Sequence, residues 1–218
     1  MPGRLESLAT GEIYHVYNRG ANKQHIFHLP RDYRRFVQTI SYYRFLGPKP
    51  KFSKFITGTI VPVELAEDKK HVEIYCYCLM PNHFHLLIKQ LKEGGISKFL
   101  GDLSNSYVKY GNLKHTRSGP LFEGRFKAVH VDRDEQFLHV SRYIHINPRV
   151  ARLVNNLDDY RWSSFGDYMI GNSSLCNVSE ILSFFANNSA DYKKFLEDQV
   201  AYGETLELIK HQLIDIDV

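Results

Sequence analysis

The sequence predicts an α+β fold in which an antiparallel sheet is covered by helices on one face. Some segments show the apolar and aromatic alternation of strands, and others repeat apolar residues at helical spacing. The two kinds follow one another as strand, helix, insert, strand, strand, helix, strand, helix, which is the order of a ferredoxin-like sheet. A helical appendage should follow, with segments at residues 181–185, 192–200 and 206–214, so the predicted domains are residues 1–170 and 171–218.

The first strand and the first helix are predicted before residue 50. Residues 12–17 are rich in β-branched and aromatic side chains, as strands are. Apolar positions between Tyr33 and Arg44 recur at helical spacing, and this helix should end before Gly47. Residues 49–70 fit neither pattern well, so we interpret them as an elaboration on the core.

Residues 75–88 predict two apolar strands joined by a tight turn at Pro81 and Asn82. Pro81 fixes φ and Asn82 tolerates unusual backbone angles, so both residues favour a turn. Just past the turn, His83 and His85 are two positions apart on a strand and therefore point to the same face. Neutral imidazole is a common metal ligand, so this pair is half of a metal site, and we expect the sheet face that holds it to be open to a ligand.

The nearby Cys76 and Cys78 raise a rival interpretation. A turn of four residues would place them across the hairpin from His85 and His83, in a set that resembles a tetrahedral zinc site. A turn of three residues would place the alternate side chains of the strand there instead. Alternating cysteines in an apolar strand more often pack as small hydrophobic side chains.

A helix, a loop and a strand are predicted after the hairpin. Apolar residues form a helical stripe over residues 96–110, and residues 111–120 follow as a basic, flexible loop. Residues 122–131 predict a strand with Arg125 and Lys127 on one face.

The last helix of the predicted sheet domain begins at Asp132. Asp132 is a plausible N-cap, and Glu135 completes a start that resembles a capping box. The helix should run to about Asn147, because the residue before Pro148 avoids the α region. Tyr143 and Asn147 are four positions apart and therefore share a face of this helix.

Basic charge is concentrated in the predicted sheet domain. Residues 1–170 contain 25 basic and 16 acidic side chains, a balance of +9, whereas residues 171–218 contain three lysines and eight acids, a balance of −5. This asymmetry is typical of a protein that binds a polyanion. Basic side chains interleaved with aromatic ones also suit a nucleic acid.

The composition disfavours several other classes of protein. No segment approaches the roughly 20 apolar residues of a membrane span, and no secretion signal is expected, so the expected location is the cytoplasm. Three irregularly spaced cysteines argue against a disulfide framework. There is no Walker or Gly-x-Gly-x-x-Gly loop, so nucleotide chemistry is unsupported.

With these motifs placed, the chain resembles the single-tyrosine HUH transposases of the IS200-like group. Within that group it is most similar to the branch associated with repetitive extragenic palindromes, and the likeness covers about residues 12–168. The motifs that carry the resemblance are Leu79-Met80-Pro81-Asn82-His83-Phe84-His85, Tyr143-Ile144-His145-Ile146-Asn147-Pro148 and Tyr160-Arg161-Trp162-Ser163-Ser164.

The resemblance implies a transposase that cuts and rejoins single-stranded or hairpin DNA without ATP. Tyr143 would attack a phosphorus and keep the 5′-phosphate as a phosphotyrosine. Without the resemblance, Tyr107 and Tyr110 would be equal candidates for this role. His83, His85 and Asn147 would hold a divalent metal, Mg²⁺ or Mn²⁺, on the scissile phosphate. His145 lies about 200° round the helix from Tyr143 and is left out of the site. The basic residues expected to contact DNA are Arg19, Lys114, Arg117, Arg125 and Lys127.

Two alternatives remain beside this interpretation. A domesticated relative would bind hairpin DNA without cutting it, although such a role needs neither the histidine pair nor Tyr143. An RNA-binding ferredoxin-like domain would explain the sheet and the basic aromatic segments but leave the histidines unused. The resemblance also leaves open whether the chain forms a homodimer.

Overall fold

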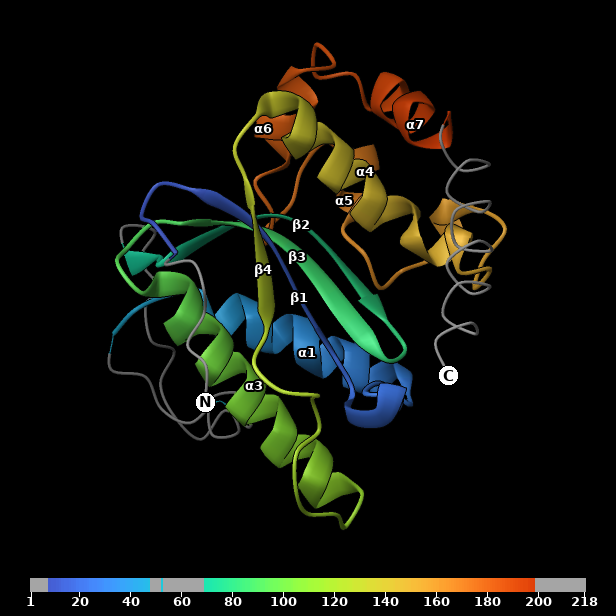
Figure 1. Ribbon diagram of the computed structural model, residues 1–218. Coiled ribbons are helices and arrows are strands. Elements are labelled where there is room, and N and C mark those ends of the chain that lie inside the picture. Colours follow the sequence, from blue (N-terminus) through green and yellow to red (C-terminus); the bar gives the residue numbers. More distant parts are fainter. Residues whose placement is uncertain (1–7, 48–51, 53–68, 199–218) are drawn as a thin grey trace, which may run out of the picture. The chain divides into compact units, whose positions relative to one another are not determined.

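The computed structural model describes residues 8–47, 52 and 69–198. Within them, four strands form one sheet in the order β2-β3-β1-β4 (Figure 1). The strands are β1 (Ile13–Arg19), β2 (Val72–Met80), β3 (His83–Gln90) and β4 (Lys127–Val131). The α-helices are α1 (Pro30–Tyr43), α3 (Gly95–Lys114), α4 (Asp134–Val150), α5 (Phe165–Ile170), α6 (Val178–Ser183) and α7 (Ser189–Glu197). The predicted α+β fold, with its antiparallel sheet and helical C-terminal part, is confirmed.

Contacts divide the described residues into two compact units. The first contains 8–47, 52, 69–73, 81–84 and 88–131, and the second contains 74–80, 85–87 and 132–198. Both units therefore draw on β2 and β3, and each has a buried core of its own.

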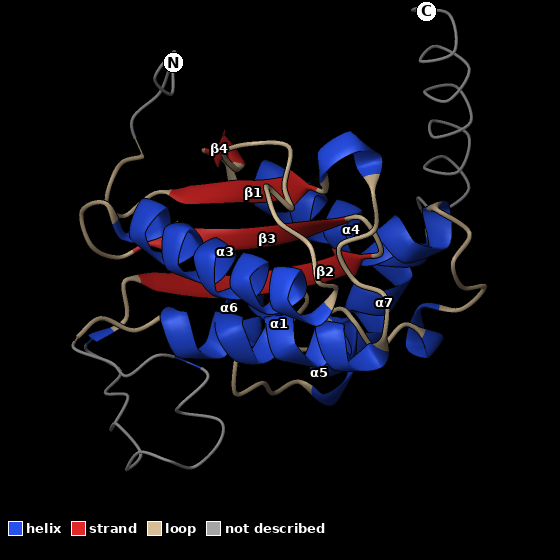
Figure 2. Ribbon diagram, turned by 90° about the horizontal axis from the view of Figure 1, so that it is seen from below, coloured by secondary structure: helices blue, strands red, loops and turns tan. Residues whose placement is uncertain are grey.

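In the first unit, α1 and α3 lie side by side (Figure 2). Their apolar stripes meet in an aromatic cluster, in which the ring centroid of Phe36 lies 5.1 Å from Phe84 and 4.9 Å from Tyr107. β1 buries alternate residues, including Tyr14 and Val16. Because Phe84 packs on α1, its neighbours in β3 project to the opposite face of the sheet.

In the second unit, α4 packs against α7, and α5 packs against both α6 and α7. The ring of Phe137 in α4 stands edge-on to Tyr75 of β2, with centroids 4.8 Å apart. Tyr192 and Leu196 of α7 are fully buried. The last two helices therefore contribute to this core, and the predicted domain boundary at residue 170 stays a prediction.

Two predicted element boundaries are wrong near Lys114 and Arg125. Helix α3 continues through Lys114, so residues 111–114 are helical and not part of the predicted loop. Strand β4 begins only at Lys127, so Arg125 precedes the strand and does not share a strand face with Lys127.

The predicted ends of α4 also need correction. The helix begins after Arg133, and the Asp132 N–H donates to the side chain of Gln136, so Gln136 takes the role assigned to Glu135. Pro148 lies inside the helix, which ends at Val150. Pro148 has no N–H to donate to the Ile144 carbonyl, and its ring is buried.

Some predictions lie outside the described residues. These include most of the elaboration at 49–70 and the last predicted helical segment, at 206–214. Helices α6 and α7 stand where segments 181–185 and 192–200 were expected.

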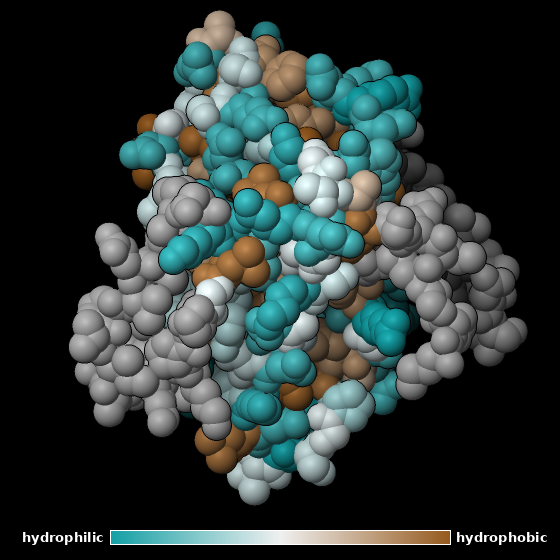
Figure 3. Space-filling view, turned by 90° about the vertical axis from the view of Figure 1, so that its left-hand side faces the viewer, coloured by the Kyte–Doolittle hydropathy of each residue, from teal (hydrophilic) through white to brown (hydrophobic). Residues whose placement is uncertain are grey.

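Hydrophilic side chains cover most of the described surface on the face shown in Figure 3, and hydrophobic ones form small, separate patches. The large hydrophobic side chains that are exposed include Leu113, Ile170 and Leu153, which belong to different elements. No helix in the part of the chain described here is long and apolar enough to cross a membrane.

The packing of α7 predicts that Leu196→Ala lowers the free energy of unfolding by about 2–5 kcal/mol, because truncating a fully buried leucine leaves a cavity. Urea unfolding followed by circular dichroism measures this change. Ile170→Ala is the control, since Ile170 is 79% exposed and its truncation should cost less than about 0.5 kcal/mol. Equal, small effects of the two substitutions would mean that α7 is not part of the core.

Candidate active site

The turn between β2 and β3 consists of only Pro81 and Asn82. The Pro81 carbonyl accepts hydrogen bonds from the N–H groups of Ile26 (2.8 Å) and Phe27 (3.1 Å), and the Asn82 carbonyl accepts one from Gly20 (2.8 Å). These bonds tie the turn to the segment that follows β1. The start of β3 is therefore held in place at the position where the histidines follow.

His83, the first residue of β3, is half-buried beside Asn82. Its Nδ1 lies 2.6 Å from the carboxamide oxygen of Asn82. A carboxamide oxygen can only accept, so Nδ1 is the protonated nitrogen and the neutral ring carries its lone pair on Nε2. An imidazole oriented in this way by a neighbouring acceptor is typical of a metal ligand.

Arg19 lies opposite His83 in the sheet. The Gly20 N–H donates to Asn82 (2.8 Å) and the Gln90 N–H donates to Glu12 (2.9 Å), so one register holds at both ends of the pairing between β1 and β3. This register sets Arg19 across from His83. The Arg19 guanidinium forms a fork with Glu123, at 3.0 and 3.2 Å, on the protein surface.

His85 lies two positions after His83 and packs against Tyr143. The imidazole is only 5% exposed, and its ring centroid lies 5.4 Å from that of Tyr143 in an edge-to-face arrangement of 84°. The sequence interpretation expected an open sheet face at this histidine, and the structure covers it instead. Tyr143 is 39% exposed, although its helical neighbours Ile144 and His145 are buried.

Two other tyrosines were equal candidates before the motifs were considered, and both are committed to the core of the first unit. The Tyr107 hydroxyl donates to the Ile26 carbonyl (2.8 Å), and burial raises the pKa of this phenol. The Tyr110 hydroxyl donates to Asp32 (2.7 Å), and burial followed by that hydrogen bond raises the pKa of Tyr110 to about 12. A nucleophile needs access to its substrate, and Tyr143 has more of it than either.

Asn147 follows Tyr143 by one helical turn and is half-buried. The described residues contain no group of three or more His, Cys, Asp or Glu side chains that could hold a metal ion. A metal bound by His83 and His85 would therefore need an amide oxygen, water or a ligand atom to complete its coordination. The Asn147 side chain supplies an oxygen of the type that hard cations accept.

The rival zinc site is not assembled among these residues. Cys76 and Cys78 are fully buried, and burial raises the pKa of both thiols. Zinc binds the thiolate form, which such burial disfavours. The two cysteines pack as small apolar side chains.

A buried polar network lies behind Tyr143 and was missed by the sequence interpretation. His145 is fully buried; its Nδ1 lies 2.7 Å from the Tyr192 hydroxyl and its Nε2 lies 2.8 Å from Ser164 Oγ. Ser164 Oγ also accepts the N–H of Tyr77 in β2 (2.9 Å). One imidazole thus connects α4 to α7 and, through Ser164, to the sheet.

Burial lowers the pKa of His145, so its imidazole is neutral within this network. Ser141 donates to the Leu138 carbonyl (2.8 Å), so its oxygen accepts from Tyr192 (3.3 Å). The Tyr192 oxygen accepts from Nδ1 of His145, which leaves Nε2 to accept from Ser164. Ser164 Oγ also lies 3.3 Å from the Tyr77 carbonyl. The sequence carried one signal of this network. A histidine stands on the buried side of the helix between Tyr143 and Asn147, and a tyrosine stands on the apolar stripe of the tail.

The predicted DNA-contacting residues lie in different environments. Lys114 is buried in an ion pair with Asp32, and Arg117 donates to Gln24 and Pro120. Arg125 is exposed in the loop before β4. Lys127 is exposed with its ammonium 6.0 Å from the centroid of the Tyr17 ring.

This fold is shared with a solved structure described as a REP-associated tyrosine transposase bound to a REP hairpin. The two chains have 16% sequence identity and a TM-score of 0.57, over 82% of this chain and 90% of that one. An identity this low shows a common fold alone.

The family comparison is more specific. Residues 61–147 match the family described as "Transposase IS200 like", in a span that includes both histidines, Tyr143 and Asn147. The resemblance to IS200-like transposases that the motifs indicated is thereby confirmed. No curated protein matches the chain.

The buried network predicts that the protein loses stability in mild acid. Burial lowers the pKa of His145 from 6.5 to about 3, and burial also lowers the pKa of His15 to about 4. Below pH 6.5 these imidazoles bind protons in the unfolded chain but stay neutral in the folded one. The free energy of unfolding is therefore highest above pH 6.5 and falls as the pH is lowered towards 3. His145 alone should cost on the order of 2 kcal/mol between pH 6.5 and 5.

Urea midpoints at pH 7.5 and pH 5 measure this loss. His145→Gln should be less stable than the parent at pH 7.5 but should lose less on acidification, because glutamine does not titrate. A variant that loses stability as steeply as the parent would show that His145 is not the group responsible.

Proposed function

We propose that this protein is a metal-dependent, single-tyrosine HUH transposase that nicks and rejoins single-stranded DNA. The observation that carries the proposal is an exposed Tyr143 packed edge-to-face on His85, within a span that matches the IS200-like family. The neighbour with the same fold is bound to a REP hairpin, and a DNA hairpin with a single-stranded flank is the substrate we propose here.

Tyr143 is the proposed nucleophile. Its phenolic oxygen forms a bond to phosphorus while the bond from phosphorus to the 3′-oxygen breaks. The phenol loses a proton and the departing 3′-oxygen gains one, so the products are a 5′-phosphotyrosine and a 3′-hydroxyl. Rejoining is the reverse reaction with a second 3′-hydroxyl, which explains why no ATP is required.

His83 and His85, two positions apart on β3, and Asn147 would hold the divalent metal, Mg²⁺ or Mn²⁺. The donor set fits such an ion: two imidazole nitrogens and an amide oxygen leave positions for water and for phosphate oxygens. When bound, the cation draws charge from the scissile phosphate. Asn82 orients His83 through Nδ1, and packing on Tyr143 restrains the His85 ring.

The basic side chains of the first unit would hold the DNA backbone. Arg19 lies opposite His83, and its surface pair with Glu123 can be exchanged for a phosphate at little cost. Lys127 lies over Tyr17, so a cation and an aromatic ring are offered together, as in single-strand binding surfaces. We assign the catalytic residues to residues 1–170 and a supporting role to residues 171–218.

The nucleophile is tested with Tyr143→Phe, which removes one oxygen and keeps the ring. Covalent adduct formation and cleavage of a labelled hairpin oligonucleotide should both disappear, whereas hairpin binding and thermal stability should persist. Denaturing gels detect the adduct, with Mn²⁺ present. Tyr107→Phe is the matched control, because that ring is buried and its hydroxyl bonds to a backbone carbonyl.

An adduct that survives in Tyr143→Phe would move the nucleophile to another residue. Tight hairpin binding by the parent protein without any adduct would instead favour the domesticated, binding-only alternative.

The metal ligands are tested with His83→Ala and His85→Ala. Each should reduce the cleavage rate at limiting Mn²⁺ by at least about 10-fold, the lower end of the losses seen when metal sites are disturbed. His83→Ala should leave the melting temperature nearly unchanged because the ring is half-buried. His25→Ala, at an exposed position outside β3, is the control. Cleavage at the parental rate in both variants would refute the metal assignment.

A further inference from the structure

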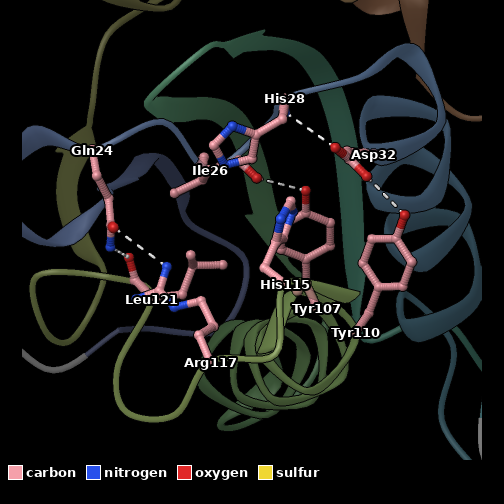
Figure 4. Close-up of a pocket in the computed structure, with 10 residues that line it drawn as sticks. Gln24, Ile26, His28, Asp32, Tyr107, Tyr110, His115, Arg117 and Leu121 are labelled. Atoms are coloured by element: carbon pink, nitrogen blue, oxygen red, sulfur yellow. Dashed lines mark hydrogen bonds between the residues drawn. The ribbon is translucent and has the colours of Figure 1, made fainter. Parts of the chain in front are cut away.

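A second polar pocket lies in the first unit, away from the histidine pair. It is a cavity of about 230 Å³ between the segment that precedes α1, the C-terminal half of α3 and the loop that follows (Figure 4). This volume is smaller than the roughly 300 Å³ at which pockets for drug-sized ligands begin, so it suits one small group. The lining residues are Gln24, Ile26, His28, Asp32, Tyr107, Tyr110, Gly111, His115, Arg117 and Leu121.

Asp32, the acidic residue of this lining, is already fully engaged. One carboxylate oxygen accepts the N–H groups of His28 and Leu29, and the other accepts Tyr110 and the Lys114 ammonium. Burial alone would raise the pKa of Asp32, but these four donors outweigh it and lower the pKa to about 2. Lys114 and Asp32 neutralise each other, so neither sets the net charge of the pocket.

With Asp32 neutralised, Arg117 gives the pocket a positive charge, and two imidazoles lie beside it. The Arg117 guanidinium donates to two neutral acceptors, Gln24 Oε1 (3.3 Å) and the Pro120 carbonyl (3.1 Å), and makes no ion pair with any residue that the structure describes. The rings of His28 and His115 lie with their centroids 4.8 Å apart and their planes tilted by 57°. Burial, followed by His115, lowers the pKa of His28, so its neutral imidazole offers one N–H as a donor.

Figure 4 shows these groups around one space, with Arg117 and His115 on one side and His28 on the other. A transition metal is a poor fit, because no group of three His, Cys, Asp or Glu side chains among the described residues could hold one. An anion fits better: it would pair with the guanidinium and accept N–H hydrogen bonds from the imidazoles.

The pocket is also connected to the start of β3. The segment from Gly20 to His28 is fastened at Gly20, Ile26 and Phe27 to the turn that precedes His83, and at Gln24 to Arg117. A shallow groove lined by Ala21, Asn22, Lys23 and Glu123 lies along the same segment. A DNA strand that lies along this segment would therefore place one phosphate at the pocket and another near the start of β3.

We propose that this pocket binds a phosphodiester group of the DNA strand, at a position other than the phosphate that is cut. Arg117 and His115 are the principal contacts, His28 is the second imidazole, and Gln24 positions the guanidinium. The inference rests on the proposed function insofar as the ligand is DNA, but binding at the pocket does not depend on cleavage.

The test measures hairpin binding by fluorescence anisotropy over a series of salt concentrations, with the full chain. Arg117→Gln removes the charge and keeps a polar side chain. It should weaken binding about five- to tenfold for every sequence and reduce the slope of log affinity against log salt by about 1. Lys98→Gln, on helix α3 before the loop that carries Arg117, is the control, since Lys98 is exposed and pairs with Asp102 outside the lining.

A substitution in the DNA locates the contact. Single methylphosphonates, which remove one backbone charge, are scanned along the oligonucleotide with the parent protein and with Arg117→Gln. One position outside the cleavage site should weaken binding to the parent and have no further effect on the variant. His115→Gln should reduce the effect of that same position.

Losses that simply add at every position, or an unchanged salt slope in Arg117→Gln, would overturn the proposal. Competition by inorganic phosphate for the pocket, with DNA affinity unaffected by Arg117→Gln, would assign it to a free anion and would also overturn it. If the parent protein forms no covalent adduct while the position-specific coupling persists, the proposed chemistry fails and the pocket assignment stands.

Discussion

The alternation of side chains along β3 is the constraint on which the candidate site depends. Phe84 packs against Phe36, so the residues on either side of it must project to the opposite face of the sheet. A slip of one residue would turn both imidazoles towards the face that packs on α1 and would turn the phenyl ring to the opposite face. The two-residue turn and its three backbone hydrogen bonds prevent that slip, because they fix where β3 begins. Core packing therefore determines the orientation of the histidines.

The orientation of Tyr143 is determined by helix α4, which buries the two residues that follow it. Ile144 and His145 occupy the core side, which leaves Tyr143 at the surface of the second unit beside His85. An isolated buried imidazole would cost several kcal/mol if it had to be charged or unpaired, so its two partners, Tyr192 and Ser164, are part of what makes this helix orientation stable. One of those partners comes from α7. The described C-terminal residues thus support the helix that carries the proposed nucleophile.

Local patterns in the sequence predicted the order of the elements, the hairpin turn and the face shared by Tyr143 and Asn147, because these depend on residues a few positions apart. Contacts between distant residues were not predictable in this way. Lys114 was expected to contact DNA, but it pairs with Asp32, 82 positions away. His145 was left out of the site because it points away from Tyr143 on the helix. Its role in the core becomes clear only from its contact with Tyr192, 47 positions later. The tail was separated by its charge, although Tyr192 and Leu196, four positions apart, already formed an apolar face.

The excess of basic residues in the first 170 positions does not by itself define a DNA-binding surface. The basic side chains differ in the interactions that each would lose on binding a phosphate. Lys114 is buried beside Asp32, and removing either partner would leave a desolvated charge at a cost of about 3–5 kcal/mol. Arg19 forms a surface pair with Glu123 that is worth at most about 1 kcal/mol, so a phosphate can replace the carboxylate. Among the described residues, Arg117 donates only to neutral acceptors, so it would lose no ion pair on binding a phosphate. A DNA phosphate should therefore bind Arg117 and Arg19 in preference to Lys114. Lys114 would keep a structural role, although it is only three positions from Arg117.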